Sequence, residues 1–297
     1  MLKLSKTDYI LSRECEKNVW VKWHLPEVYG QYEVSEFEQS LGVLGNEIEE
    51  LARGMFSGGY LVERRSDGAQ VLTQKLVAEH TPVVFQAVFA TDKFLAATDV
   101  LKWNASVGAY DLYEIKMSST EEEDEDGKKR VNRKKETQFE YDLTFQYNVL
   151  TLCGVKIHKK YLVRLNKEYV RKGELDFLQL FIFEDKTEIV DLLAEQVLAE
   201  MSRVYEYLTQ TKEPDGHCAC YHKGRSAHCT TFAHNNPSVP TYSVHDLYKI
   251  GNSKAYLIEL LNTGVVSIDD VPIDDRLDPK KPAKGKNPSL PRKRTQV

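Results

Sequence analysis

The stretch at 94–118 constrains the fold of this chain more than any other part of the sequence. It contains two runs rich in β-branched and aromatic residues, separated by a short polar break at 104–108. Such a pattern predicts a β-hairpin whose turn lies at the break. If Trp103 pairs with Tyr110, the register of the whole hairpin follows.

This register brings two carboxylates and a lysine close together. Asp99 then lies directly opposite Glu114, with Cβ atoms ~5 Å apart. Two carboxylates at that separation repel each other unless a cation lies between them. Oxygen ligands suit a hard divalent ion such as Mg²⁺ or Mn²⁺. Lys116 shares a face of the strand with Glu114, and its ammonium would orient a water on the metal or neutralise charge on a phosphate.

The alternation of Glu114 and Lys116 also has a second interpretation. Charged residues make up 29% of the chain, and an alternating Glu and Lys is common on a solvated edge strand, where it discourages aggregation. Short motifs often match by chance, so this one alone leaves both interpretations open.

The length and composition indicate a globular protein with charged appendages. The chain has 297 residues, 41% of them hydrophobic and 10% aromatic, so it can bury a sizeable core. We expect a cytoplasmic protein that does not enter a membrane, because the N-terminus lacks the apolar core of a signal peptide and no run is long enough to span a bilayer. Five cysteines in such a chain are not expected to form disulfides. The net charge of −5 does not exclude nucleic acid, because it conceals two basic blocks.

Hydrophobic periodicity predicts an α/β fold with a central mixed sheet flanked by helices. The helix at 35–56 would bury one stripe, formed by Phe37, Leu41, Leu44, Ile48, Leu51 and Met55. Besides the hairpin, the expected elements are a helical entry at 4–23, helices at 71–79, 141–154 and 187–208, and strands at 83–89, 160–166 and 177–183.

Charge blocks and proline-rich composition predict the domain limits. Six consecutive acidic residues at 121–126 and six basic ones within 128–135 predict a disordered charged loop at 118–138. We expect a main domain at 1–234, a small helical extension at 235–273 and a disordered basic tail at 274–297.

The segment at 217–234 holds three cysteines and four histidines. In a cytoplasmic protein such a density usually indicates a metal or an iron–sulfur cluster. The alternative is that these cysteines and histidines lie in an ordinary loop and bind no metal.

Taken in chain order, these features resemble a RecB-like nuclease of the PD-(D/E)xK superfamily. The similarity is to the iron–sulfur branch that includes CRISPR-adaptation exonucleases and the AddB nuclease domain, and to the N-terminal part of a bacterial RecB-like family in which a further domain follows. The segments that carry the resemblance are LSKTDYILSREC at 4–15, GNEIE at 45–49, ATDVL at 97–101, YEIK at 113–116 and FQYNVL at 145–150. The resemblance implies a restriction-endonuclease-like core.

The resemblance also implies an active site. Asp99, Glu114 and the carbonyl of Ile115 would hold Mg²⁺ or Mn²⁺, and Glu49 would complete the site directly or through water. Lys116 would position the attacking water. Gln146, which begins the family's Gln-x-x-x-Tyr pattern although Leu150 replaces the tyrosine, would align the site or the strand.

A second implied site is a four-iron–four-sulfur cluster. One cysteine near the start and three after the last core helix match the family's ligands, here Cys15, Cys218, Cys220 and Cys229. The last three follow a C-x-C-x8-C spacing in place of the family's C-x2-C-x5-C, so Zn²⁺ is the alternative, with histidines of 217–234 as further ligands. We expect Cys153 to be a buried thiol without a metal.

The expected function is a metal-dependent DNA nuclease, exonuclease-like, acting in DNA repair or defence. The alternatives are a nucleic-acid-binding or assembly module with a vestigial site, and an interaction protein stabilised by zinc. The expected partners are DNA and a further domain or protein that contacts the C-terminal extension.

Overall fold

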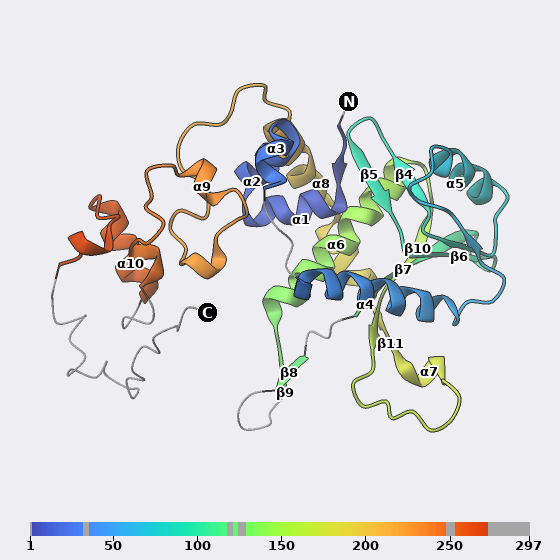
Figure 1. Cartoon of the computed structure of the whole chain (residues 1–297). Helices are drawn as coiled ribbons and strands as arrows, with labels where there is room; N and C mark the ends of the chain where they lie inside the picture. Colours follow the sequence, from blue (N-terminus) through green and yellow to red (C-terminus); the bar gives the residue numbers. More distant parts are fainter. Residues whose placement is uncertain (1, 32–35, 118–120, 124–128, 248–252, 273–297) are drawn as a thin grey trace. The chain divides into compact units, whose positions relative to one another are not determined.

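The computed structural model describes residues 2–31, 36–117, 121–123, 129–247 and 253–272, and it shows a mixed α/β fold (Figure 1). The chain divides into two compact units. Unit 1 comprises Met1–Ile10 and Glu33–Thr209, and unit 2 comprises Leu11–Tyr32 and Gln210–Val297. The boundary falls within helix α1, Lys6–Glu14.

Unit 1 contains a six-stranded mixed sheet in the order β11-β10-β7-β6-β3-β2. Strands β3, β6 and β7 pair antiparallel, whereas β7 and β10 pair parallel. A parallel pair needs a crossover connection, and helix α6, Arg133–Leu152, lies between these two strands in the chain. The strands are β2 Tyr60–Leu61, β3 Val83–Phe85, β6 Val100–Asn104, β7 Ala109–Lys116, β10 Ile157–Leu165 and β11 Phe181–Asp185.

The hairpin formed by β6 and β7 has the predicted register. Trp103 pairs with Tyr110, and Val100 pairs with Tyr113. Gly108 closes the turn with a φ of 64° and donates its N–H to the carbonyl of Asn104 at 3.0 Å. Glycine adopts this left-handed conformation without the steric cost of a Cβ. The prediction that 94–118 contains a hairpin is confirmed.

A second, three-stranded sheet has the order β1-β5-β4, with β1 at Leu4–Ser5, β5 at Phe94–Ala97 and β4 at Val88–Ala90. The single strand expected at 83–89 is therefore wrong, because β3 and β4 belong to different sheets. Gln86 separates them with a φ of 53°, a left-handed conformation that turns the chain out of the first sheet. The predicted first run of the hairpin is likewise divided, into β5 and β6.

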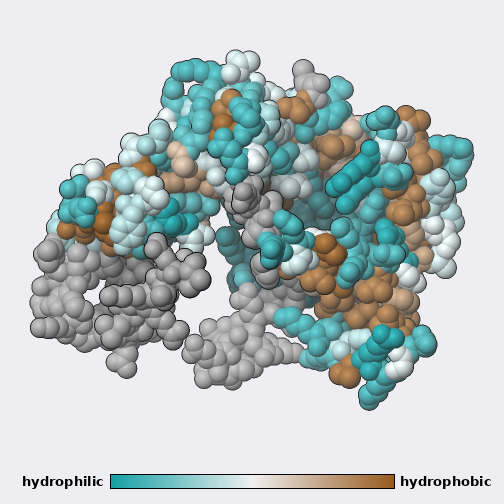
Figure 2. Space-filling model, in the orientation of Figure 1, coloured by the Kyte–Doolittle hydropathy of each residue, from teal (hydrophilic) through white to brown (hydrophobic). Residues whose placement is uncertain are grey.

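One hydrophobic core cluster of unit 1 lies between the six-stranded sheet and helix α4, Glu36–Arg53. Ile48 and Leu51, from the second half of α4, pack against this core. Leu41 and Leu44, in the first half, are 37% and 46% exposed, so the predicted buried stripe is wrong there. The side chain of Phe37 lies outside the described residues. Figure 2 shows hydrophobic residues among hydrophilic ones on the visible face.

Helices α6 and α8 contact each other and the sheet. Helix α8 spans Thr187–Leu208, as predicted. Helix α5 spans Ala69–Ala78, and the short helix α7, Phe177–Leu180, replaces the first part of the strand expected at 177–183.

The prediction of a disordered loop at 118–138 is wrong for its described residues. Strands β8, Glu121–Glu123, and β9, Lys129–Val131, pair antiparallel. Asn132 caps α6 by accepting a hydrogen bond from the backbone of Lys135 at 3.1 Å, so the helix begins inside the basic block. Residues 118–120 and 124–128 lie outside the described part of the chain.

Unit 2 combines an N-terminal segment with the C-terminal part of the chain. Its elements are α2 Glu16–His24, α3 Pro26–Tyr29, α9 Phe232–Asn235, α10 Ser253–Asn262 and the 3₁₀ helices η1 Arg225–Ala227, η2 Val244–Asp246 and η3 Ile268–Asp270. The expected boundary at 234 differs from this division, because Tyr221 of the cysteine-rich segment shares a core with Val244 and Leu260. The expected tail at 274–297 lies outside the described residues.

Candidate functional site

Unit 1 contains a buried cluster of charged groups around Glu114, which is 1% exposed on β7. Its Oε1 accepts hydrogen bonds from the ammonium groups of Lys6 at 2.8 Å and Lys116 at 2.6 Å. Its Oε2 accepts one from Nε2 of Gln146 at 2.7 Å. Helix α1, strand β7 and helix α6 thus meet at one carboxylate. We call Lys6, Glu114, Lys116, Asp142 and Gln146 the carboxylate–lysine cluster.

Asp142 is the second carboxylate of the cluster. It lies on α6 four residues before Gln146, so the two side chains share a helix face. Its Oδ2 is 2.5 Å from Nζ of Lys116 and its Oδ1 is 3.6 Å from Nζ of Lys6. The two lysines therefore both bridge Glu114 and Asp142.

Asp99 lies immediately before β6 and faces the same cluster. Its Oδ2 accepts a hydrogen bond from the backbone N–H of Ile115 at 2.7 Å. Burial raises the pKa of Asp99 to about 8, and the negative charges of Glu114 and Glu49 add to the increase, while Lys6 opposes it. Asp99 and Glu114 act on each other electrostatically, as expected from the hairpin register.

The protonation states of Glu114 and Asp99 differ. Burial by itself would raise the pKa of Glu114, but the ammonium groups of Lys116 and Lys6 hold that pKa below its ordinary range. Burial would lower the pKa values of Lys6 and Lys116, but Asp142 and Glu114 raise both. At neutral pH Glu114 is a carboxylate between two ammonium groups, whereas Asp99 is mostly protonated.

Glu49 lies at the edge of this region. It is 9% exposed, accepts a hydrogen bond from Gln86 at 2.7 Å and is 3.7 Å from Arg53, one turn along α4. Its negative charge is a minor contribution to the raised pKa of Asp99. Among the described residues, no group of three or more carboxylate or histidine side chains lies close enough together to hold a metal ion. Glu49, Asp99 and Glu114 are therefore neighbours without forming a closed set of ligands.

Two oxygen atoms of the cluster suit a hard cation. Oε1 of Gln146 is buried without a hydrogen-bond donor, and Oδ1 of Asp142 is buried with only the ion pair to Lys6 at 3.6 Å. A buried acceptor without a donor is unfavourable, and carboxylate and amide oxygens are ligands that Mg²⁺ and Mn²⁺ accept. The residue types present therefore fit a divalent ion.

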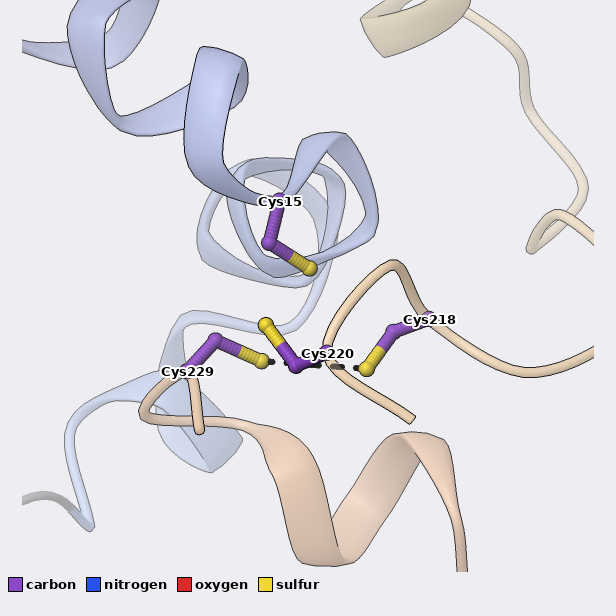
Figure 3. A group of neighbouring side chains, drawn as sticks. All are labelled: Cys15, Cys218, Cys220 and Cys229. Carbon is purple, nitrogen blue, oxygen red and sulfur yellow. Dashed lines mark hydrogen bonds between the residues drawn. The ribbon is translucent and has the colours of Figure 1, made fainter. Parts of the chain in front are cut away.

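Unit 2 contains the second candidate site, which we call the four-cysteine group. The sulfur atoms of Cys15, Cys218, Cys220 and Cys229 all lie within 4.8 Å of one another (Figure 3). Cys15 precedes α2, and the other three come from the segment before α9. Three of the four are almost fully buried, with exposed fractions of 1% to 4%. The prediction that these cysteines converge is confirmed, and the group could bind a metal ion.

Donor groups surround these sulfur atoms. Nδ2 of Asn236 donates to Sγ of Cys218 at 3.3 Å, and Nζ of Lys223 donates to Sγ of Cys220 at 3.7 Å. The ring of His217 contacts Oδ1 of Asn236 at 2.9 Å. Among the described residues, the group that could bind a metal contains no histidine.

The four thiols affect one another's ionisation. A hydrogen bond from Cys15 lowers the pKa of Cys218 and lowers that of Cys220 to about 7. Hydrogen bonding to Cys218 raises the pKa of Cys15, and Cys15 in turn raises that of Cys229. Two of the sulfurs are thus disposed to be thiolates, the form that binds metals.

Cys153 lies apart from this group, as predicted, but it is exposed. It occupies the C-cap position of α6, and Gly154 follows it with a φ of 81°. Because the helix ends there, the thiol reaches the surface, and the expectation of a buried thiol is wrong.

Two residues of the carboxylate–lysine cluster were missed by the sequence analysis. Asp142 had a usable signal, because it is spaced one helical turn from Gln146. Lys6 had none, because its contact with Glu114 joins positions 108 apart in the chain. Such a contact follows from the tertiary fold alone.

No protein-family model matches this chain, and no curated protein matches it either. Within the described part of the chain, every helix is too short or too polar to cross a membrane. The fold and the two sites therefore define the protein as an α/β protein with a buried carboxylate–lysine cluster and a four-cysteine group.

Proposed function

We propose that this protein is a Mg²⁺- or Mn²⁺-dependent DNA nuclease, exonuclease-like, that acts in DNA repair or defence. The element order supports a restriction-endonuclease-like core. A helix (α4) precedes three antiparallel strands (β3, β6 and β7), and a helix (α6) then leads to a strand (β10) parallel to the third.

The contact set of Glu114 is the observation that carries the proposal. A glutamate held by Lys116 and Gln146, beside Asp99 at the start of the adjacent strand, matches the residue types expected for a phosphodiesterase site. Asp99, Glu114 and the carbonyl of Ile115 would hold the metal, and Glu49 would complete the site. The metal would polarise the phosphate and lower the pKa of a bound water.

The protein groups have separate roles in this proposal. Lys116 holds the attacking water, or neutralises charge that develops on the phosphate. Gln146 fixes the orientation of the Glu114 carboxylate. In the reaction the water oxygen bonds to phosphorus and releases a proton to solvent, the bond from phosphorus to the leaving sugar oxygen breaks, and that oxygen takes up a proton from solvent.

The test uses labelled linear and circular DNA with Mg²⁺ or Mn²⁺, and with EDTA as the control. We expect cleavage that requires the metal and falls at least about 100-fold in Asp99→Asn, Glu114→Gln and Lys116→Met. The matched control is Asp111→Asn. It removes another buried carboxylate from β7, one that contacts His158 at 3.0 Å. Cleavage that persists in all three variants, or that is lost equally in Asp111→Asn, contradicts the proposal.

A second function, DNA binding by a vestigial site, is favoured by one observation. Lys6 and Lys116 already neutralise Glu114 and Asp142, so the cluster is balanced without a metal. Metal-independent DNA binding with no cleavage of any substrate would support this function instead.

A further inference from the structure

We propose that the four-cysteine group holds a single zinc ion, and not the four-iron–four-sulfur cluster that the resemblance implies. The spacing of the sulfur atoms distinguishes the two metal centres. A tetrahedral zinc ion with Zn–S distances of about 2.3 Å holds its four sulfurs about 3.8 Å apart.

The spacing in this chain matches a single ion. Sγ of Cys218 and Sγ of Cys229 are 3.9 Å apart, and no pair among the four exceeds 4.8 Å. Figure 3 shows the four side chains directed toward one another, with the sulfurs innermost. A four-iron cluster binds each thiolate through a different iron. Its sulfurs therefore stand at the corners of a larger tetrahedron and do not approach to near contact.

The composition of the site also fits structural zinc. Four thiolates complete a tetrahedral shell and leave no open position, which is typical of zinc that stabilises a fold. Burial of Cys15, Cys218 and Cys220 excludes water from the centre.

The neighbouring donors offset the charge of such a site. Zinc with four thiolates carries two negative charges, which hydrogen bonds and nearby cations stabilise. Lys223 supplies an ammonium at Cys220, and Asn236 supplies an N–H at Cys218. Asn236 is fixed in this orientation because its Nδ2 also donates to the carbonyl of Phe232 at 2.9 Å. Its Oδ1 can only accept, so His217 donates to it through Nδ1.

The test is metal and sulfide analysis of the full chain, purified both in air and anaerobically. We expect one zinc per chain, no acid-labile sulfide and no visible colour in either preparation. Reconstitution with Co²⁺ should give the absorption of a tetrahedral four-thiolate site. Iron and sulfide in equal amounts, or a chain without bound metal after both purifications, would overturn the assignment.

Variants test the residues that hold and surround the ion. Cys229→Ser should lose most of the zinc, whereas Cys153→Ser, a matched thiol outside the group, should keep all of it. Asn236→Ala should retain zinc but release it to a chelator about tenfold faster. If Asn236→Ala releases zinc at the same rate as the unaltered protein, Asn236 does not stabilise the zinc site. These measurements need no DNA, so their outcome is independent of the nuclease assay.

Discussion

At the scale of single residues, the charge on Asp99 depends on the groups packed around it. Burial and the carboxylates of Glu114 and Glu49 raise its pKa to about 8, whereas Lys6 and Lys116 keep Glu114 ionised. Asp99, just before β6, and Glu114, on β7, therefore differ in protonation at neutral pH. The sequence predicted that both would lie here, but not this difference, because Lys6 and Asp142 were absent from the predicted site.

The raised pKa of Asp99 predicts how stability without metal changes with pH. Its ordinary value is 3.8 and its folded value is about 8, so between these pH values the folded state binds the proton more tightly than the unfolded state. The free energy of unfolding should therefore fall as the pH rises from about 4 to about 8, by up to about 1.4 kcal/mol per pH unit, and then level off. Urea titrations in EDTA at several pH values measure this. The decline should disappear in Asp99→Asn and persist in Asp111→Asn, and a decline common to all three proteins would refute the assignment.

At the scale of elements, periodic hydrophobic patterns predicted several helices and strands correctly, whereas the points where a strand ends and the chain changes direction were not predicted. Helix α8 and the β6–β7 register matched because each depends on side chains within the element. The break at Gln86 was not predicted, because no sequence pattern indicates a glutamine with positive φ. In the structure Gln86 donates its backbone N–H to the carbonyl of Asp99 and its side-chain amide to the carboxylate of Glu49. The buried stripe predicted for helix α4 is correct only in its second half, because the residues of its first half do not pack against the core.

Two glycines test how closely elements pack in unit 1. A Cβ at Gly59 would lie 2.0 Å from the ring of Phe85, a core residue that is 6% exposed. A Cβ at Gly45, within α4, would meet nothing within 4 Å. Gly59→Ala should lower the free energy of unfolding by about 1–3 kcal/mol, and Gly45→Ala should raise it by about 0.5–1 kcal/mol. Chemical denaturation of both variants measures this, and a loss of stability in Gly45→Ala would show that another group approaches that helix face.

At the scale of the whole molecule, the chain does not divide where its composition changes. Proline content suggested a boundary after 234, but the cysteine-rich segment belongs to unit 2 together with 11–32. Contacts between distant positions cause this: Oδ1 of Asn18 accepts hydrogen bonds from Thr230 and Thr231, and the indole of Trp20 donates to the carbonyl of Gln210. A single sequence does not encode such pairings as a local pattern.

Removal of the metal from the four-cysteine group should destabilise unit 2. Cys15 and Cys218 are separated by about 200 residues, and a cross-link that closes so long a loop is worth up to ~5 kcal/mol for a disulfide, by restricting the unfolded chain. The metal of the four-cysteine group should likewise stabilise the folded state by restricting the unfolded chain. Removing it with a chelator should therefore increase amide hydrogen exchange in α2 and α9 by at least about 100-fold, since 1.4 kcal/mol corresponds to tenfold. Mass spectrometry of peptides from the holoprotein and the chelated protein measures this, with α8 of unit 1 as the internal reference. Unchanged exchange in α2 and α9 after complete metal removal would show that the group does not stabilise unit 2, and equal increases in α8 would show that the effect is not confined to it.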